Sequence, residues 1–464
     1  MTSYHFVGIG GIGMSAIARV LRARGERVSG SDLCLNPLVE ALRVQGVSVA
    51  IGHHGRNVRD ADVVVVSSAI DRRRNPEALA AARRGTPVLH RGEMLARLLA
   101  GRSGIAVAGT HGKTTTTAMT YTVLRGGGID AGLVLGGIDT LLATNASDGT
   151  SRWFVTEADE SDGSFALLEP MVAVVTNIEN DHLNSDDELP GLARAFAEFL
   201  AKLPAQGLAL VGIDNPLAES LTAHDLRARI LTYGFDPRAD VHAVHPTYAD
   251  FGSRFEVIAE NRSLGMFELR VPGAMNVQNA LAAIAIAREL GVCIESIAAS
   301  LQGFRGVRRR FEILTSSERI TIVDDYAHHP TAVRATIAAA REYHRGELVV
   351  AFQPHRYSRT AFLAHEFASA LLGADRIYLA PVYAASEPAI PGVSERSIGE
   401  RLESAGAAVR YVSNVAELEE RLFDETASGS LVLMLGAGDI TDAAVGLARR
   451  FAEPIESRAA SVGA

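Results

Sequence analysis

The sequence predicts an α/β protein made of three domains. Short apolar runs alternate with amphipathic stretches of helical period along almost the whole chain, a pattern typical of parallel sheets covered by helices. Residues 63–67 form an almost pure β-branched run, as expected of a parallel strand buried on both faces. At roughly 150 residues per domain, the 464 residues correspond to about three domains.

The first predicted domain covers residues 1–102. Strands are expected at 4–8 and 63–67, and helices at 13–25 and 76–84. This regular alternation predicts an N-terminal Rossmann-like parallel sheet.

The second predicted domain covers residues 103–314. A buried strand at 105–108 leads into a glycine-rich turn and a helix that begins at Lys113. Further strands are expected at 173–176 and 208–211. Polar and apolar residues alternate between 235 and 272, which predicts an antiparallel patch, and an Ala-rich helix follows at 276–290.

The third predicted domain covers residues 315–464 and is a second Rossmann-like α/β domain without sequence repetition of the first. Its expected strands are 320–324, 348–353, 376–380, 409–412 and 431–435, and its expected helices include 331–343 and 360–372.

Composition excludes several classes of protein. Lys and Arg number 45 and Asp and Glu 54, a net charge of -9 that argues against a nucleic-acid partner. The two cysteines exclude a disulfide scaffold and favour a reducing compartment. No apolar run approaches the roughly eighteen residues that span a bilayer, and no secretory signal is recognisable. We therefore expect a soluble cytoplasmic protein without a membrane partner.

The first glycine-rich loop is Gly8-Ile9-Gly10-Gly11-Ile12-Gly13, between a strand and a helix. Such glycines allow close approach of a diphosphate to a helix N-terminus. Asp32, at the end of the next expected strand, is placed to reach a ribose hydroxyl. Taken alone, the loop predicts a dinucleotide site, although glycines that only pack the helix on the strand are an alternative.

The second loop, Gly109-Thr110-His111-Gly112-Lys113-Thr114-Thr115, is a shortened phosphate-binding loop. Val107 stands where the longer motif has glycine, so the pattern is GxxGKT. Backbone N–H groups, the Lys113 ammonium and the Thr114 hydroxyl retain the means to bind phosphate and Mg²⁺. The loop predicts a central P-loop ATPase-type α/β domain and phosphoryl transfer from ATP.

Two further motifs follow strands of the same domain. Glu157 begins an acidic segment at a strand end, where carboxylates suit Mg²⁺, although a solvated acidic loop has the same composition. His182 ends the segment 176–182 and is either a structural histidine or a ligand. Because both follow strands near the P-loop, we expect both to take part in the metal site.

Three polar clusters lie near or within the third domain. Arg310 belongs to an arginine cluster at the domain junction, which is either a solvated face or an arginine finger. His328, in segment 324–330, is a candidate for proton removal. Arg356, in segment 353–359, is suited to carboxylate recognition.

These motifs resemble those of the Mur ligase family over essentially the whole chain. They are GIGGIGMS (8–15), GSD (30–32), SSAI (67–70), GTHGKTTTT (109–117), EADESDGSF (157–165), TNIENDH (176–182), FRGVRRRFE (304–312), DDYAHHPT (324–331), FQPHRYSRT (352–360) and GAGDI (436–440). The resemblance implies ATP- and Mg²⁺-dependent ligation of L-alanine to the carboxylate of UDP-N-acetylmuramate, through an acyl phosphate, for peptidoglycan synthesis. It also implies a monomer or weak homodimer.

The resemblance implies three groups of site residues. Those for the UDP-sugar are Gly8, Gly10, Gly11, Gly13, Met14, Ser15, Asp32, Ser68 and Arg91. Those for ATP are Gly109, Thr110, His111, Gly112, Lys113, Thr114, Thr115, Asn276, Asn279 and Arg310, with Thr114, Glu157 and His182 around the metal. Those for the amino acid are Tyr326, His328, Arg356 and Arg359. Lys113, Glu157, His182, Arg310 and His328 are the expected catalytic residues.

The chain departs from the family pattern at Met275, Asn184 and Pro381, which affects adenine contact, the metal motif and the amino-acid pocket, respectively. A related class ligates a murein tripeptide, and Ser161 with residues 163–165 favours the L-alanine class instead. An NAD-dependent oxidoreductase and a catalytically inactive nucleotide-binding regulator are the remaining alternatives.

Overall fold

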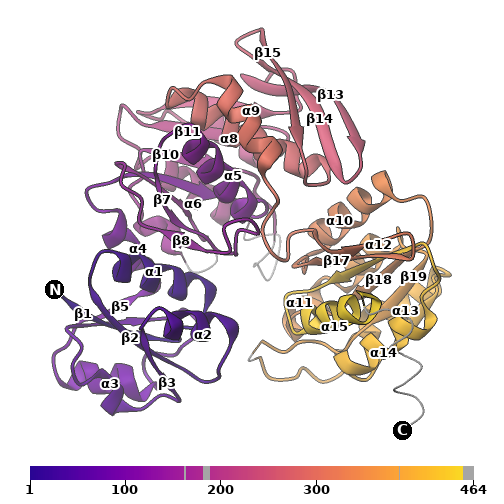
Figure 1. Cartoon of the computed structure of the whole chain (residues 1–464), viewed down its shortest axis with the longest axis horizontal. Coiled ribbons are helices and arrows are strands. Elements are labelled where there is room, and N and C mark those ends of the chain that lie inside the picture. The colour runs from indigo at the N-terminus through magenta and orange to yellow at the C-terminus, as the bar shows by residue number, and fades with distance from the viewer. Residues whose placement is uncertain (161–162, 181–188, 386, 453–464) are drawn as a thin grey trace. The chain divides into compact units, whose positions relative to one another are not determined.

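The computed structural model describes residues 1–160, 163–180, 189–385 and 387–452 (Figure 1). The chain divides into two compact units. The first contains Met1–His245, Phe255–Glu268 and Val277–Arg305, and the second contains Pro246–Arg254, Leu269–Asn276 and the chain from Gly306 onward. No helix in the described part of the chain is both long and apolar enough to cross a bilayer.

The N-terminal part of the first unit is a five-stranded parallel sheet in the order β3-β2-β1-β4-β5. Its strands are β1 (Ser3–Val7), β2 (Arg27–Asp32), β3 (Ser48–Ile51), β4 (Val63–Val66) and β5 (Val88–His90). Its helices are α1 (Ile12–Ala23), α2 (Pro37–Val44), η1 (Gly55–Val58), α3 (Pro76–Arg83) and α4 (Arg91–Leu99).

Strand β4 is buried on both faces, as its composition predicts. Val63 and Val65 pack in the core formed with α1, α2 and α4. Val64 and Val66 pack in a second core formed with η1 and α3. The Rossmann-like prediction for this part of the chain is confirmed.

A ten-stranded sheet, most of which belongs to the first unit, has the order β15-β14-β13-β12-β11-β10-β6-β9-β7-β8. Its strands are β6 (Ser103–Ala108), β7 (Gly132–Val134), β8 (Ala146–Ser147), β9 (Trp153–Glu157), β10 (Val172–Val175), β11 (Leu208–Gly212), β12 (Arg229–Gly234), β13 (Val241–Ala249), β14 (Gly252–Ala259) and β15 (Arg262–Leu269). Its helices include α5 (Lys113–Gly126), η2 (Ser164–Leu167), α6 (Leu189–Leu200), α7 (Pro216–Ser220), η4 (Leu221–Ala223), α8 (Ala274–Glu289) and α9 (Ile294–Gly303).

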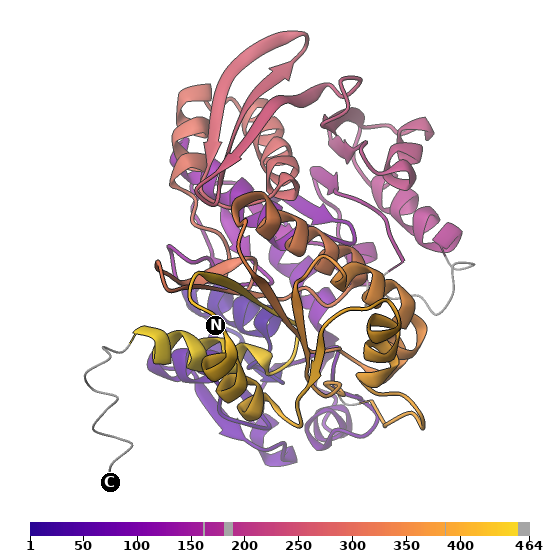
Figure 2. The ribbon, with the colours of Figure 1, turned by 90° about the vertical axis from the view of Figure 1, so that its right-hand side faces the viewer.

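The antiparallel patch expected in residues 235–272 corresponds to the hairpins of β13, β14 and β15 (Figure 2). Two-residue turns at 250–251 and 260–261 join these strands, and all four turn residues have positive φ, between 50° and 59°. Positive φ at both central positions is the geometry of a tight hairpin turn that matches the twist of the strands.

The second unit contains a six-stranded sheet in the order β16-β17-β21-β18-β19-β20. Its strands are β16 (Glu312–Ser316), β17 (Ile320–Asp325), β18 (Leu348–Phe352), β19 (Arg376–Leu379), β20 (Val409–Tyr411) and β21 (Ser430–Leu435). Its helices are α10 (Pro330–Tyr343), α11 (Tyr357–Phe362), α12 (Ala364–Leu371), α13 (Arg396–Ser404), α14 (Val415–Glu425) and α15 (Ile440–Ala452).

Helices cover both faces of this sheet (Figure 1). The side chains of β18 alternate between a core shared with α10, α12 and α13 and a core shared with α14 and α15. The single helix expected at 360–372 is instead two helices, because Leu363 leaves the helical conformation and buries its side chain in the core. Residues 312–316 add β16 to this sheet by antiparallel pairing with β17, so a boundary at 315 falls inside a strand.

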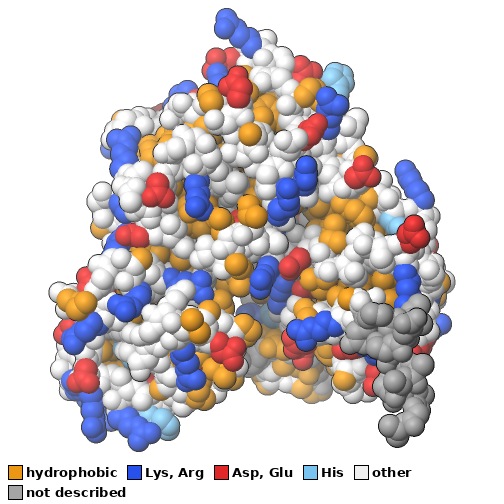
Figure 3. Space-filling model, in the orientation of Figure 1, with side chains coloured by type: hydrophobic (Ala, Val, Ile, Leu, Met, Phe, Trp, Pro, Cys, Tyr) orange, Lys and Arg blue, Asp and Glu red, His pale blue; other side chains and the backbone are white. Residues whose placement is uncertain are grey.

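Basic and acidic side chains are interspersed on the surface. On the described residues of the face in Figure 3, Lys and Arg alternate with Asp and Glu, and neither sign forms an extended field. On this face the charged residues therefore form neither a basic nor an acidic patch.

A buried carboxylate of α3 contacts residues of β1, β2 and η1. Glu77, in the first turn of α3, is inaccessible to solvent and accepts hydrogen bonds from Ser31 Oγ at 2.5 Å and Asn57 Nδ2 at 2.6 Å. The Nε2 atom of His5 lies 3.6 Å from the carboxylate. Burial by itself raises the pKa of Glu77, but the His5, Ser31 and Asn57 side chains outweigh it and lower this pKa to about 2.

We predict that Glu77→Gln lowers the free energy of unfolding at pH 7 by on the order of 3 kcal/mol. Because the pKa is lowered in the folded state, the carboxylate stabilises the fold above its ordinary pKa of 4.5 and loses this effect as the pH falls toward about 2. Urea unfolding of both proteins should therefore show a difference that shrinks below pH 4.5. Glu40→Gln, at an exposed position of α2, controls for the loss of one charge. An equal difference at pH 7 and pH 3 would contradict this role of the carboxylate.

Candidate functional site

The first glycine-rich loop lies between β1 and the N-terminus of α1. Gly8 has φ +81°, a conformation that favours glycine. A Cβ on Gly10 would lie 2.9 Å from Asp32 Oδ2, and one on Gly13 would lie 2.8 Å from Arg91 Nη1. Gly11 caps α1 without a side-chain hydrogen bond. The loop therefore has close backbone packing and helix N–H groups suited to an anion.

Asp32 supports this loop directly. Its Oδ2 accepts a hydrogen bond from Gly10 N at 2.8 Å, and its Oδ1 accepts one from Leu33 N at 2.8 Å. The carbonyl oxygen of Ser31 also accepts hydrogen bonds from Gly8 N and Ile9 N. The end of β2 therefore fixes the loop that was expected to meet a diphosphate.

The remaining residues expected around the UDP-sugar differ in exposure. Met14 and Ser15 are buried, and Ser15 Oγ bonds to Ile12 O and to Asn145, so their side chains serve packing. Ser68 is exposed beside His90, and Arg91 Nη2 lies 3.3 Å from Asp159. Thus only part of this predicted group presents side chains to the loop.

The phosphate-binding loop connects β6 to α5. Gly109 and Gly112 have φ values of +124° and +83°, and a Cβ on either would overlap a neighbouring residue. Gly112 is also the residue before the first turn of α5. Positive φ, close packing and a helix N-terminus explain the glycines and make this loop a phosphate cradle.

Segment 176–180, which follows β10, is hydrogen-bonded to that loop. Asn177 O accepts a hydrogen bond from Thr110 N at 2.9 Å, and Asn177 Oδ1 accepts one from His111 N at 2.8 Å. Thr176 Oγ1 donates to His111 O at 2.6 Å. The loop shape therefore depends on a second strand end as well as on its own glycines.

Thr114 and Glu157 meet at the same edge of the sheet. Thr114 Oγ1 lies 3.0 Å from Glu157 Oε2, and Gly136 N donates to Glu157 Oε1. A hydroxyl and a carboxylate oxygen are hard donors that fit Mg²⁺. The third expected metal ligand, His182, lies outside the described residues, as does Asn184.

Lys113 has an acidic partner that sequence reasoning did not identify. Its Nζ lies 2.9 Å from both carboxylate oxygens of Glu160 and also donates to the carbonyl oxygens of Gly109 and Thr110. Burial raises the pKa of Glu160, and Lys113 partly offsets that effect. The sequence feature that could have identified Glu160 is the acidic segment after β9, because it supplies more than one carboxylate to the end of that strand.

The residues expected near adenine and behind the loop are largely buried. Asn279 Oδ1 accepts a hydrogen bond from Thr116 Oγ1 at 3.0 Å. The same oxygen packs so closely on Gly112 that a Cβ at that position would lie 2.5 Å from it. Asn276 Nδ2 donates to Pro272 O at 2.7 Å, and Thr115 is 8% exposed. Asn279 thus supports the phosphate loop from α8.

In the second unit, aromatic and histidine rings gather at the ends of β17 and β18. The ring centres of Tyr326 and His328 are 5.0 Å apart, and those of His328 and His355 are 5.5 Å apart. His355 stacks on Tyr383 at 5.7 Å. The Arg310 guanidinium lies over the Tyr326 ring at 5.2 Å, so the junction arginines and the predicted amino-acid residues share one surface.

Arg356 and Arg359 differ in environment. Arg356 is about half exposed, has φ +70°, and its Nη1 lies 3.9 Å from Glu387. Arg359 is 8% exposed and lies within α11. Burial raises the pKa of Glu387, but Ser358 and Arg356 outweigh it and lower this pKa. Of these two arginines, Arg356 has the more exposed guanidinium, and Glu387, which no motif assigned, lies beside it.

Two adjacent aspartates anchor the junction from β17. Asp325 accepts hydrogen bonds from Phe311 N at 2.6 Å and Ala327 N at 2.7 Å. Asp324 lies 3.7 Å from Arg309 Nε. Burial raises the pKa of Asp324 to about 6, although Thr441 and Arg309 oppose the shift.

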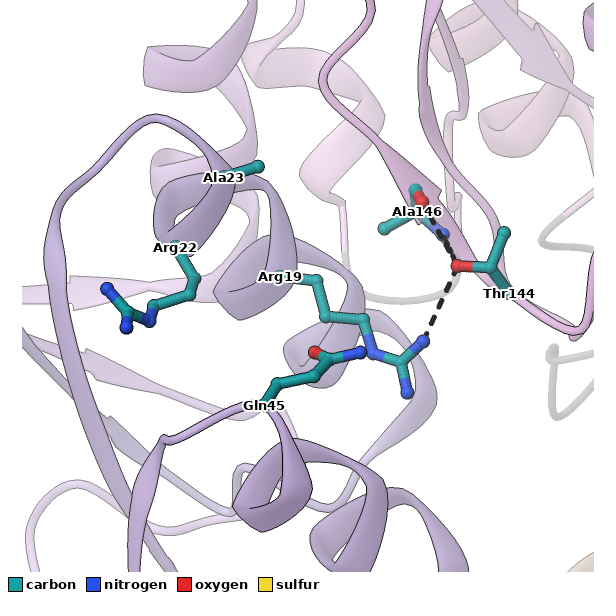
Figure 4. Close-up of a pocket in the computed structure, with 6 residues that line it drawn as sticks. All are labelled: Arg19, Arg22, Ala23, Gln45, Thr144 and Ala146. Atoms are coloured by element: carbon teal, nitrogen blue, oxygen red, sulfur yellow. Dashed lines mark hydrogen bonds between the residues drawn. The ribbon is translucent and has the colours of Figure 1, made fainter.

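A separate open pocket of about 510 Å³ lies between α1 and residues 144–146 (Figure 4). Arg19 points toward Thr144, with Nη1 3.4 Å from the hydroxyl, and Arg22, Ala23 and Gln45 line the same pocket. It contains none of the residues expected to bind a substrate.

The comparisons with known proteins cover nearly the whole chain. Residues 3–103 match the model of the Mur ligase family catalytic domain, 107–287 that of the Mur ligase middle domain, and 309–438 that of the Mur ligase glutamate ligase domain. The UDP-N-acetylmuramate–L-alanine ligase of Syntrophotalea carbinolica is 45% identical over 437 residues, which are 94% of this chain and 95% of that protein. That of Acidithiobacillus ferrooxidans is 45% identical over 455 residues, or 97% and 98% of the two chains.

Solved structures agree with the sequence relatives. The UDP-N-acetylmuramate–alanine ligase of Thermotoga maritima aligns with a TM-score of 0.83 and 30% identity, covering 97% of this chain and 99% of that one. A murein peptide ligase of Psychrobacter arcticus aligns with a TM-score of 0.74 and 25% identity, covering 98% and 100%. With three family models in order and relatives of 45% identity over nearly full length, the chain belongs to the Mur ligase family.

Proposed function

We propose that this chain is an ATP-dependent ligase that joins L-alanine to the carboxylate of UDP-N-acetylmuramate in peptidoglycan precursor synthesis. The observation that carries the proposal is the phosphate cradle at β6 and α5, with Lys113, Thr114 and Glu157 converging on it, in a chain 45% identical to L-alanine ligases over 94% of its length. We also propose a cytoplasmic location, because ATP is available there.

The chemistry requires activation of a poor electrophile. A carboxylate does not react with an amine, whereas an acyl phosphate has a good leaving group. The muramoyl carboxylate attacks the γ-phosphorus of ATP, the bond to the β-phosphate oxygen breaks, and ADP leaves. The alanine amine then attacks the acyl carbon, loses a proton and expels phosphate. Lys113 and the N–H groups of the loop neutralise charge on the transferring phosphoryl group.

Magnesium fits the donor set at this edge of the sheet. Thr114 and Glu157 would hold it, with His182 as a further candidate outside the described residues. When bound, Mg²⁺ supplies neutralisation of phosphate charge.

The second unit supplies the groups expected for alanine. Arg356 has the fork geometry that pairs with a carboxylate, and it lies 3.9 Å from Glu387. His328 Nδ1 lies 2.8 Å from Tyr326 O, and its imidazole is the group that takes the proton of the amine. A neutral tautomer that donates from Nδ1 suits this role.

The alternatives have less support. An NAD-dependent oxidoreductase has no use for the phosphate loop, Lys113 and Glu157. A murein tripeptide ligase remains the nearer alternative, but the structure of the alanine ligase aligns with a higher TM-score and identity than that of the murein peptide ligase. Phosphate release measured with UDP-N-acetylmuramate and a panel of L-alanine, glycine, L-serine and the tripeptide tests the choice.

We predict that Lys113→Ala lowers phosphate release by at least about 100-fold, because the transferring phosphoryl group loses its cation. UDP-N-acetylmuramate binds at the N-terminal sheet, so its affinity by calorimetry should stay within about twofold of the wild type. Loss of UDP-sugar binding in this variant would show that the two loops are not separate sites.

Glu157→Gln should raise the Mg²⁺ concentration that gives half-maximal turnover by about tenfold, because an amide is a weaker ligand than a carboxylate. A magnesium titration of initial rates measures this change. Glu198→Gln, which removes an exposed acid from α6, is the control. Identical titration curves for Glu157→Gln and the wild type would remove Glu157 from the metal site.

Arg356→Ala should raise the KM for alanine about tenfold or more and leave the KM for ATP within about twofold, because only the amino-acid carboxylate loses its cation. Acyl phosphate trapped by borohydride reduction should still form. Arg401→Ala, at an exposed position of α13, should change neither constant. An equal rise in both KM values would contradict the assignment.

A further inference from the structure

The contact between Lys113 and Glu160 has no part in the mechanism above. The Glu160 side chain is 4% exposed, and both of its oxygens lie 2.9 Å from Lys113 Nζ. The same ammonium donates to Gly109 O at 2.6 Å and to Thr110 O at 3.3 Å. Because an ammonium has three N–H groups, its whole donor capacity is engaged within the protein.

We propose that Glu160 sets the affinity for ATP by holding Lys113, so that a nucleotide phosphate must take this ammonium from the carboxylate in order to bind. This inference rests on the proposed ATP-binding function. It adds a positioning residue whose effect opposes binding, since carboxylate and phosphate compete for one cation.

Two costs follow when a phosphate displaces the carboxylate. A charge-assisted hydrogen-bonded pair breaks. The Glu160 carboxylate then remains buried beside the added negative charge of the nucleotide, an unfavourable arrangement for an unpaired charge. Its neighbour Asp159 is also acidic, and its charge adds to the burial that raises the pKa of Glu160. Asp159 has a partner of its own, Arg91, at 3.3 Å.

The backbone around Glu160 is held independently of the ion pair. Gly163 N donates to Glu160 O at 3.2 Å, and Phe165 N donates to Asp159 O at 3.1 Å. Phe165 is buried, with ring-centre distances of 5.4 Å to Phe196 and 5.3 Å to Phe199. Replacement of the carboxylate by an amide should therefore leave this segment in place while it removes the charge.

The test is calorimetric binding of the β,γ-imido analogue of ATP, with Mg²⁺, to the full chain. Glu160→Gln should lower the Kd for the analogue by about tenfold, because the competing charge is gone. In steady-state assays, the KM for ATP should fall while that for UDP-N-acetylmuramate is unchanged. Damage to the loop, or a role in which Glu160 orients Lys113 for the phosphate, predicts weaker binding instead.

Glu289→Gln is the matched control. Glu289 pairs with Arg229 in the same unit and lies ten residues beyond Asn279 on α8, or about 15 Å along the helix axis. Its removal should leave the Kd unchanged. Glu160→Asp keeps the charge on a shorter side chain, so it should bind the analogue two- to threefold more tightly, a shift of roughly half that in Glu160→Gln on the energy scale. This variant tests the proposal if the amide variant does not fold.

The outcomes separate this inference from the proposed function. If the wild type binds the analogue and both Glu160 variants bind it as tightly as the wild type or more weakly, the proposal that Glu160 competes with the nucleotide is wrong. The proposed ligase function is not affected by that result. If the wild type itself does not bind the analogue, both proposals are wrong. Tighter binding by the Glu160 variants, with an unchanged Glu289→Gln, supports the inference.

Discussion

The parallel pairing of β10, β6 and β9 is the constraint on which the candidate ATP site depends. These strands are neighbours in the central sheet, with Val107 of β6 in register with Val174 and Glu157. Because parallel strands end at one edge, the phosphate loop, the acidic segment and the segment that begins at Thr176 start side by side. The hydrogen bonds of Asn177 to the loop and of Thr114 to Glu157 follow from that register. A shift of one residue would turn Glu157 to the opposite face of the sheet.

Three buried charged side chains in the described part of the chain have charged or polar partners. Lys113 is paired with Glu160, Glu77 with Ser31 and Asn57, and Asp324 with Thr441 and Arg309. A buried ion without a partner costs several kcal/mol, and these contacts offset part of that cost. At the phosphate loop the same pairing has a functional consequence, because the cation that the protein neutralises is the one a nucleotide requires.

Much of the fold and part of the site could be predicted from local patterns. Three predicted elements lie where the sequence places them: the β-branched run at 63–67, the strand at 105–108 and the helix from Lys113. Their positions could be predicted because the spacing of apolar residues in each element reflects which of its faces are buried. The break at Leu363 and the strand at 312–316 were not predicted. The Leu363 side chain packs in a core formed with distant segments of the chain. Strand β16 pairs with the neighbouring β17, and a register shift between Ile313 and Thr315 interrupts the regular alternation that would have indicated a strand.

The α/β class, the two glycine loops and the residue types able to bind phosphate and Mg²⁺ could be predicted from the sequence, because glycine, lysine and carboxylate chemistry is local. Which of these groups meet follows from the tertiary structure. It assigned Glu160 to Lys113, Asn177 to the phosphate loop and Glu387 to Arg356. In that structure the side chains of Met14 and Ser15 are also buried in the core. The reason is physical: strand register and burial fix the partners of a side chain, and these are set by residues far away in the chain.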